Sequence, residues 1–311
     1  MDLMAERAGG RWAHTYSIVA RDPETGEMGV AVQSHWFAVG TSVTWGEAGV
    51  GVVATQALCD VSYGPRGLEL MRDGMHAGQA LDALLQLDRS RAVRQVAMVD
   101  AQGGVAAHTG RRCIPQAGHI AASDFSVQAN MMLNDEVWPG MAQRFQQWKG
   151  SLAERLLAAL EAGEEAGGDI RGRQSAAMLV VRGEATGRPW RDRLVDLRVD
   201  DHREPLEELK RLLKVHRAYQ HMDMGDKALE DEDMPMAMRH YALAERMFPR
   251  SLEMRFWHAV TLANNGHLDE ALPIFKKVFA RDENWRELAA RLAPVGMLKV
   301  DQAGLQKIVG L

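Results

Sequence analysis

The order of strand-like and helix-like segments over residues 15–200 constrains this fold most. The segment 15–21 (TYSIVAR) is rich in β-forming residues, and the segment 28–34 (MGVAVQS) is apolar. Between them, Asp22-Pro-Glu-Thr-Gly26 carries proline and glycine where a tight turn needs them. The pattern predicts that the two segments pair as a β-hairpin.

Helices and further strands follow in alternating blocks. Apolar residues recur at helical spacing over 65–87, with interruptions near Gly74 and Gly78, which indicates two helices. Two more helices are expected at 134–148 and 151–165. Strands are expected at 43–45, 50–54, 94–100, 104–108, 125–131, 175–181 and 194–199. This succession favours an α+β fold, a four-layer αββα sandwich with two sheets between helix layers.

The pattern after Pro205 is helical throughout and contains an internal repeat with a period of about 34 residues. The residues that match at this offset are Gly225 and Ala259, Ala237 and Ala271, Tyr241 and Phe275, and Ala244 and Val278. Small residues let two helices approach closely, and an aromatic residue fills the space between them. The segment resembles tetratricopeptide repeats, with flanking helices at 206–216 and 286–311. We therefore expect an N-terminal extension (1–14), a sandwich domain (15–203) and an all-α helical repeat domain (204–311).

Composition and charge exclude several functional classes. The net charge of −5 gives no basic face for nucleic acid, and no apolar run approaches the ~20 residues of a membrane span. The segment 1–14 has no apolar core, so we expect no secretory signal there. Cys59 and Cys113 could pair, but two unpaired thiols in a reducing compartment are the preferred interpretation, which favours the cytoplasm.

Several long motifs occur in an order that resembles a bacterial family known as domain of unknown function 1028. They are TYSIVARDPETGEMGVAVQS, AGVGVVATQALCDVSYGPRGLELM, GRRCIPQAGH, GGDIRGRQSAAMLVVR and DRLVDLRVDDH. The resemblance extends from Thr15 to about Asp201, well over half of the chain, and implies an N-terminal-nucleophile (Ntn) hydrolase-like fold. It implies no established activity. In Ntn hydrolases the first side chain is the nucleophile and the free α-amine is the base.

The resemblance makes Thr15 the candidate nucleophile. The segment 1–14 precedes it, so its amine becomes free only if the His14–Thr15 bond is cut by the chain itself or by another protease. The structural alternative is that threonine is simply a good strand residue. Asn130, at the end of a predicted strand, is a candidate oxyanion donor, although asparagine is also common in turns.

The resemblance to proteasome-like enzymes has one departure at the end of the second strand. Those enzymes carry a lysine there, whereas this chain has Gln33-Ser34-His35. Ser34 and His35 are the candidates to take its place. Strict proteasome-like chemistry is therefore not expected.

A glycine-rich loop at 167–175 leads into an apolar strand and collects polar side chains. Such a loop offers backbone N–H groups and arginine forks for a carboxylate or another anion. The alternative is a turn tied together by an aspartate–arginine pair. The candidate substrate-binding residues are Asp169, Arg173, Gln174 and Ser175, with Arg171 beside them.

A second polar cluster precedes the first predicted helix. Tyr63 and Arg66 are candidates to line the substrate cleft. The alternative is that Pro65 begins the helix and that Asp60 or Ser62 caps it.

No metal site or cofactor is predicted. His108, His119 and His202 are scattered and show no metal-ligand spacing. The methionines at 222, 224, 234, 236 and 238 look like a metal box, but helix packing is the preferred interpretation.

Two functions follow as expectations. The first is an Ntn-type hydrolase that acts on a small amide or peptide-like substrate, with a small-molecule amide or an anionic ligand as its binding partner. The second is a non-catalytic binding or scaffold protein that holds a protein partner at residues 206–311. We expect no nucleic-acid or membrane partner, and the glycine-rich strands could support a homodimer.

Overall fold

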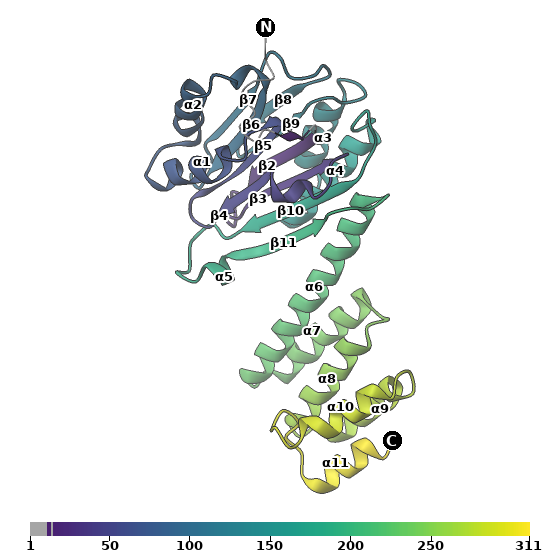
Figure 1. Ribbon diagram of the computed structural model, residues 1–311. Helices are drawn as coiled ribbons and strands as arrows, with labels where there is room; N and C mark the ends of the chain where they lie inside the picture. The colour runs from purple at the N-terminus through teal and green to yellow at the C-terminus, as the bar shows by residue number, and fades with distance from the viewer. Residues whose placement is uncertain (1–10, 14) are drawn as a thin grey trace. The chain divides into compact units, whose positions relative to one another are not determined.

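The computed structural model describes residues 11–13 and 15–311 (Figure 1). The chain divides into two compact units, Met1–Lys210 and Arg211–Leu311. The first unit is a mixed α+β unit and the second is helical. The division falls inside helix α6 (Pro205–Glu230), a few residues beyond the boundary expected at 203/204.

Two antiparallel sheets form the first unit. Sheet A has the order β1-β5-β6-β7, and β4 also pairs with β5. Its strands are β1 (Arg11–Ala13), β4 (Thr44–Glu47), β5 (Gly51–Cys59), β6 (Arg94–Asp100) and β7 (Val105–Thr109). Sheet B has the order β11-β10-β3-β2-β9-β8. Its strands are β2 (Thr15–Arg21), β3 (Met28–Ser34), β8 (Gly118–Ala122), β9 (Phe125–Ala129), β10 (Ser175–Val181) and β11 (Arg193–Val199).

The hairpin expected over 15–34 is confirmed. Strands β2 and β3 pair antiparallel from Thr15 opposite Ser34 to Arg21 opposite Met28. In the turn, the Asp22 carboxylate accepts hydrogen bonds from the backbone N–H groups of residues 24 and 25. Gly26 takes a φ of 74°, which is costly for residues with a Cβ.

Helices cover the outer face of each sheet. The helices α1 (Tyr63–Arg72) and α2 (Ala77–Leu87) contact sheet A, whereas α3 (Val137–Gln147) and α4 (Leu152–Glu165) contact sheet B. The short α5 (Pro189–Asp192) precedes β11, and two 3-10 turns occupy Val39–Thr41 and Arg91–Val93. All four long helices lie where the sequence periodicity places helices.

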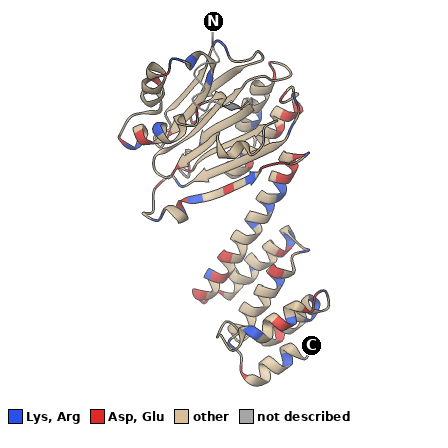
Figure 2. Cartoon of the chain, in the orientation of Figure 1, with Lys and Arg blue, Asp and Glu red and all other residues tan. Residues whose placement is uncertain are grey.

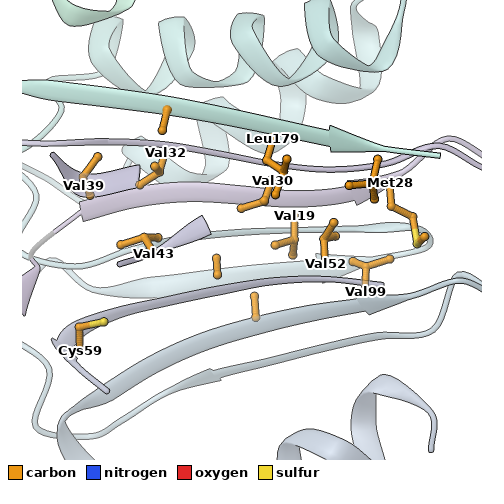
Figure 3. Packing of buried hydrophobic residues seen from close by; sticks show 14 of the residues in the cluster. Val19, Met28, Val30, Val32, Val39, Val43, Val52, Cys59, Val99 and Leu179 are labelled. Atoms are coloured by element: carbon orange, nitrogen blue, oxygen red, sulfur yellow. The ribbon is translucent and has the colours of Figure 1, made fainter. Parts of the chain in front are cut away.

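The inner faces of the two sheets share a hydrophobic core. Val19, Val30 and Leu179 of sheet B meet Val52 and Val99 of sheet A in one buried cluster (Figure 3). Side chains alternate along a strand, so every second one points into this layer. The same alternation fixes the direction of the polar side chains at the strand ends.

The second unit consists of packed helices. They are the end of α6, α7 (Met234–Met247), α8 (Leu252–Asn264), α9 (Leu268–Phe279), α10 (Asn284–Leu292) and α11 (Gln302–Val309). The helix expected over 206–216 continues to residue 230, because no proline interrupts it. The matched pairs of the repeat are buried in equivalent places, as Tyr241 and Phe275 illustrate. A Cβ on Gly225 would lie 2.5 Å from the Tyr241 ring, so the small residue allows the close approach.

Charged residues of both signs are interspersed along α6 (Figure 2). Within the part of the chain that the structure describes, no helix combines the length and the apolarity of a membrane-spanning segment.

Candidate functional site

A row of three hydroxyls crosses one end of sheet B. Thr15 begins β2, Ser34 ends β3 and Ser175 begins β10, and the register places Ser34 directly opposite both of the others. All three residues are fully buried. The Thr15 hydroxyl donates a hydrogen bond to Ser34 Oγ at 3.2 Å. The row faces sheet A, because Val32 and Ala177, two residues along their strands, belong to the shared core.

Amide side chains from β5, from β6 and from the residue after β9 surround Thr15. Its carbonyl oxygen accepts hydrogen bonds from Gln56 Nε2 at 3.1 Å, from the Asn130 backbone N–H at 3.1 Å and from Asn130 Nδ2 at 3.4 Å. Gln95 Oε1 accepts from Gln56 Nε2 at 2.7 Å and from Asn130 Nδ2 at 2.9 Å. The network therefore fixes the backbone of Thr15. The Asn130 side-chain amide donates both of these bonds within the protein.

Side chains of β2 and β9 in sheet B extend this network to Gln56 of β5 in sheet A. Gln128 Nε2 donates to Ser17 Oγ at 2.6 Å, and Ser17 Oγ donates to Gln56 Oε1 at 2.6 Å. Ser126 donates to Gln128 Oε1 at 3.0 Å. Gln95 and Gln128 are not among the site residues expected from the sequence. The available signal was a lone glutamine within an otherwise apolar strand, which is costly to bury unless it is hydrogen-bonded.

The glycine-rich loop is held by its own side chains. The Asp169 carboxylate pairs with the Arg171 guanidinium at 2.7 Å and accepts a hydrogen bond from the His35 backbone N–H at 3.2 Å. The loop is thus tied to the residue that follows Ser34 of the hydroxyl row. This aspartate–arginine pair is the one expected if the loop is a turn tied together by its own side chains and not an anion-binding site.

The other loop candidates also have partners within the first unit. Arg173 lies between Glu164, at 3.2 Å, and Glu204. Gln174 Nε2 donates to Asp201 at 3.1 Å. Ser175 Oγ accepts from the Val39 N–H at 3.1 Å and donates to the Trp36 carbonyl. In this arrangement, these side chains organise the strand ends around Thr15.

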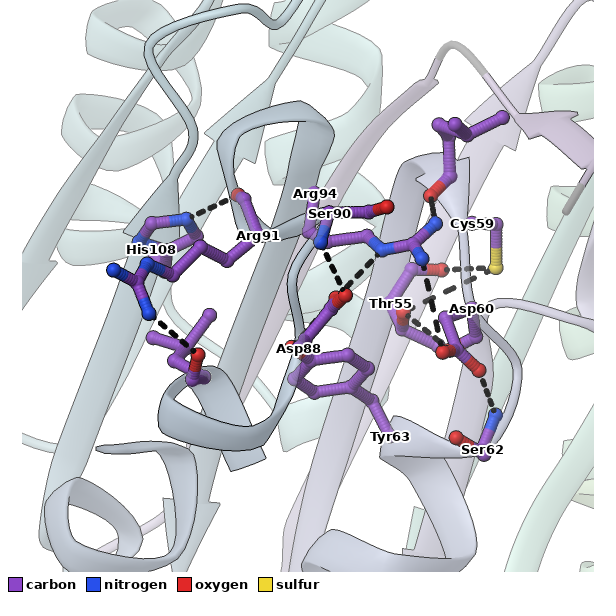
Figure 4. Close-up of polar contacts among 12 residues, drawn as sticks. Thr55, Cys59, Asp60, Ser62, Tyr63, Asp88, Ser90, Arg91, Arg94 and His108 are labelled. Carbon is purple, nitrogen blue, oxygen red and sulfur yellow. Dashed lines mark hydrogen bonds and ion pairs between the residues drawn. The ribbon is translucent and has the colours of Figure 1, made fainter. Parts of the chain in front are cut away.

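Tyr63 and Arg66 line a separate pocket of about 140 Å³ together with Asp60 and Asp88. Figure 4 shows Tyr63, Asp60 and Asp88 near Arg94. Tyr63 belongs to the hydrophobic cluster between sheet A and its covering helices, whereas Gln56 points to the opposite face of that sheet. The structure therefore places Tyr63 and Arg66 together but apart from Thr15.

Arg94 organises the polar side of this pocket. Its Nε donates to Asp88 Oδ2 at 2.8 Å, and its Nη2 lies 3.8 Å from Asp60 Oδ2. Tyr63 also donates to Asp88, at 3.1 Å. Burial and the nearby Asp88 carboxylate raise the pKa of Tyr63, so this phenol stays protonated at neutral pH.

A larger pocket, of about 620 Å³, lies at the other end of sheet B. Its lining includes Arg21 at the end of β2 and Arg182 just after β10. Thr15 and Ser175 begin these two strands, so this pocket does not serve the hydroxyl row.

The cysteines do not resemble a catalytic nucleophile. Cys59 and Cys113 are both free. Burial raises the pKa of each thiol to about 11, so both remain protonated at neutral pH. Among residues 11–13 and 15–311, no group of three or more His, Cys, Asp and Glu side chains has a metal-binding arrangement. His202 accepts the Glu204 N–H through Nδ1, as expected for a turn.

The fold and the polar cluster define a class of α+β proteins with two facing antiparallel sheets and a threonine at the start of a central strand. The chain belongs to the family of unknown function DUF1028, whose model matches residues 15–209. A crystal structure of protein SPO2555 from Silicibacter pomeroyi, described as a DUF1028 member, is 35% identical. The match has a TM-score of 0.59 and covers 65% of this chain and 85% of that chain. No curated protein matches this chain.

Proposed function

We propose that residues 15–209 form an Ntn-type amide hydrolase whose nucleophile is the Thr15 hydroxyl. Its base is the Thr15 α-amine, which becomes free when the bond before Thr15 is cut. The observation that carries this proposal is the position of Thr15. It is the first residue of β2, and its hydroxyl contacts Ser34 inside the buried polar cluster. The family match also begins at this residue. Two sheets between two pairs of helices support an Ntn-type sandwich.

The proposed reaction uses the free amine that cleavage would create. An α-amine has a pKa of about 7.7–8.0, so at neutral pH it can accept the proton from the Thr15 hydroxyl. The Thr15 Oγ1 then attacks the substrate carbonyl carbon, and the proton passes to the leaving amine. Water hydrolyses the resulting ester and restores the threonine. In this scheme Ser34 orients the hydroxyl, and Gln56 and Asn130 hold the Thr15 backbone.

Cleavage would also cut the covalent link between β1 and the site, which allows β1 to leave. This strand pairs with β5 from Ala57 to Cys59, immediately after Gln56. Its loss would uncover the edge of β5 beside Thr15. We propose that a small amide or peptide-like substrate enters there.

The test uses a chain that begins Met-Thr15, from which methionine aminopeptidase removes the methionine. We expect turnover of at least one member of a small-amide panel. Thr15→Ala should lower turnover by more than about 10³-fold, whereas Thr15→Ser should retain part of it. Thr44→Ala, in β4, is the matched control and should keep full activity. Equal turnover by the Thr15→Ala protein would reject the proposal.

A second function, a tetratricopeptide-like scaffold, is favoured by the second unit. Positions one repeat apart are buried equivalently in successive helix pairs, as such a repeat requires. We propose that this unit binds a protein partner in a reducing compartment such as the cytoplasm, consistent with the two free thiols. Deleting residues 211–311 should abolish binding to a purified partner while circular dichroism shows a folded first unit. Unchanged binding would contradict this second function.

A further inference from the structure

The methionine run of the second unit divides into two groups. Met222 is buried, and Met234 and Met238 pack against hydrophobic clusters. Met224 and Met236, in contrast, are 50% and 41% exposed. Helix packing therefore accounts for three of these methionines and leaves two unexplained.

A pair of histidines lies on the same two helices as the exposed methionines. His221 of α6 and His240 of α7 place their Nδ1 atoms 3.0 Å apart. Two imidazoles on one tetrahedral metal ion, each at ~2.0–2.1 Å, have nitrogens about 3.3 Å apart. A small movement of the rings would therefore allow both Nδ1 atoms to bind one ion.

Helix periodicity places a thioether beside each imidazole. Met224 follows His221 by three residues, and Met236 precedes His240 by four, so each pair shares one helix face. Helices α6 and α7 are joined by the short turn at 231–233, so they run antiparallel. Met224 and Met236 therefore both lie nearer than the histidines to the same end of the helix pair, the end with the turn.

We propose that His221, His240, Met224 and Met236 form a binding site for Cu(I). Thioether sulfurs favour this soft ion, and imidazole also binds copper. Hard divalent ions prefer carboxylate oxygens, and the carboxylate of Asp226 is already hydrogen-bonded to Tyr241.

The charges around the site suit a monovalent ion. Arg217 lies one helical turn before His221 on α6. The nearby Arg217 opposes any cation, and a monovalent ion meets less of this repulsion than a divalent one.

The test is an anaerobic competition for Cu(I) between the full chain and bicinchoninate, read by absorbance. We expect the wild-type protein to withdraw one Cu(I) per chain. His221→Ala and His240→Ala should each weaken binding at least 100-fold, and the double variant Met224→Leu/Met236→Leu at least 10-fold. His267→Ala and Met75→Leu, which change an unrelated histidine and an exposed methionine, are the matched controls and should bind as the wild type does.

Three results would overturn the site. The first is a wild-type protein that withdraws no Cu(I) from the chelator. The second is unchanged affinity in either histidine variant, with circular dichroism confirming that it is folded. The third is full affinity in the double methionine variant, which would remove the reason to assign Cu(I).

Discussion

At the residue scale, Asp88 shows how one carboxylate links stability to pH. It accepts hydrogen bonds from Arg94, from Tyr63 and from the Ser90 backbone N–H. Burial alone would raise its pKa, but these bonds and the Arg94 charge outweigh burial and hold the pKa below its usual 3.8. A carboxyl group whose pKa is lower in the folded state stabilises the protein when the pH is above its unfolded-state pKa. This stabilisation is lost as the pH falls through the folded-state pKa.

Asp88→Asn should therefore destabilise the first unit more at neutral pH than in acid. We expect a loss of about 2 kcal/mol in the free energy of unfolding at pH 7. The gap between variant and wild type should shrink at pH 3. Urea unfolding followed by tryptophan fluorescence measures both values. Asp82→Asn, an exposed change in α2, is the control, and an equal gap at both pH values would contradict the assignment.

Part of the polar network around Thr15 could be predicted from the sequence. The resemblance and the strand ends selected Thr15, Ser34 and Asn130, and the structure brings these three together. The contacts of Gln56 and Gln95 depend on how the two sheets face each other. Gln56 meets Thr15 and Gln95 across 41 and 39 positions of the chain, so local patterns could not predict these contacts.

At the element scale, the packing of α1 on β4 depends on a glycine. A Cβ at Gly64 would lie 2.3 Å from the Trp45 indole, whose Nε1 donates to the Ser42 carbonyl at 3.0 Å. Because this bond restrains the ring, it cannot easily move aside.

Gly64→Ala should lower the free energy of unfolding of the first unit by about 1–3 kcal/mol. Gly78→Ala in α2 is the matched control, since no atom lies within 4 Å of its added Cβ. That change should be neutral or stabilising by up to ~1 kcal/mol. Chemical denaturation of both variants makes the comparison. Similar stability of the two variants would show that α1 has room to shift.

The strongly patterned elements were predictable and the weak ones were not. Runs of β-forming and apolar residues on either side of a proline–glycine turn predicted β2 and β3. Strands β1 and β8 were missed because β1 has only three residues and β8 (GHIAA) has few β-forming residues and no buried position. Both lie at sheet edges, where pairing with a neighbouring strand determines the conformation.

At the scale of the whole molecule, the hydrolase proposal depends on one peptide bond. Strand β1 lies in sheet A, whereas β2 lies in sheet B, so the chain passes from one sheet to the other between Ala13 and Thr15. As long as this connection is intact, the nitrogen of Thr15 is part of an amide and cannot act as a base.

The most direct test is the intact mass of the purified, untagged protein. The proposal predicts a species that has lost residues 1–14 and begins at Thr15. Thr15→Ala, in which self-cleavage through the hydroxyl is impossible, would distinguish self-cleavage from processing by another protease. A mass that retains the segment 1–14, in protein that turns over amides, would contradict the Ntn mechanism.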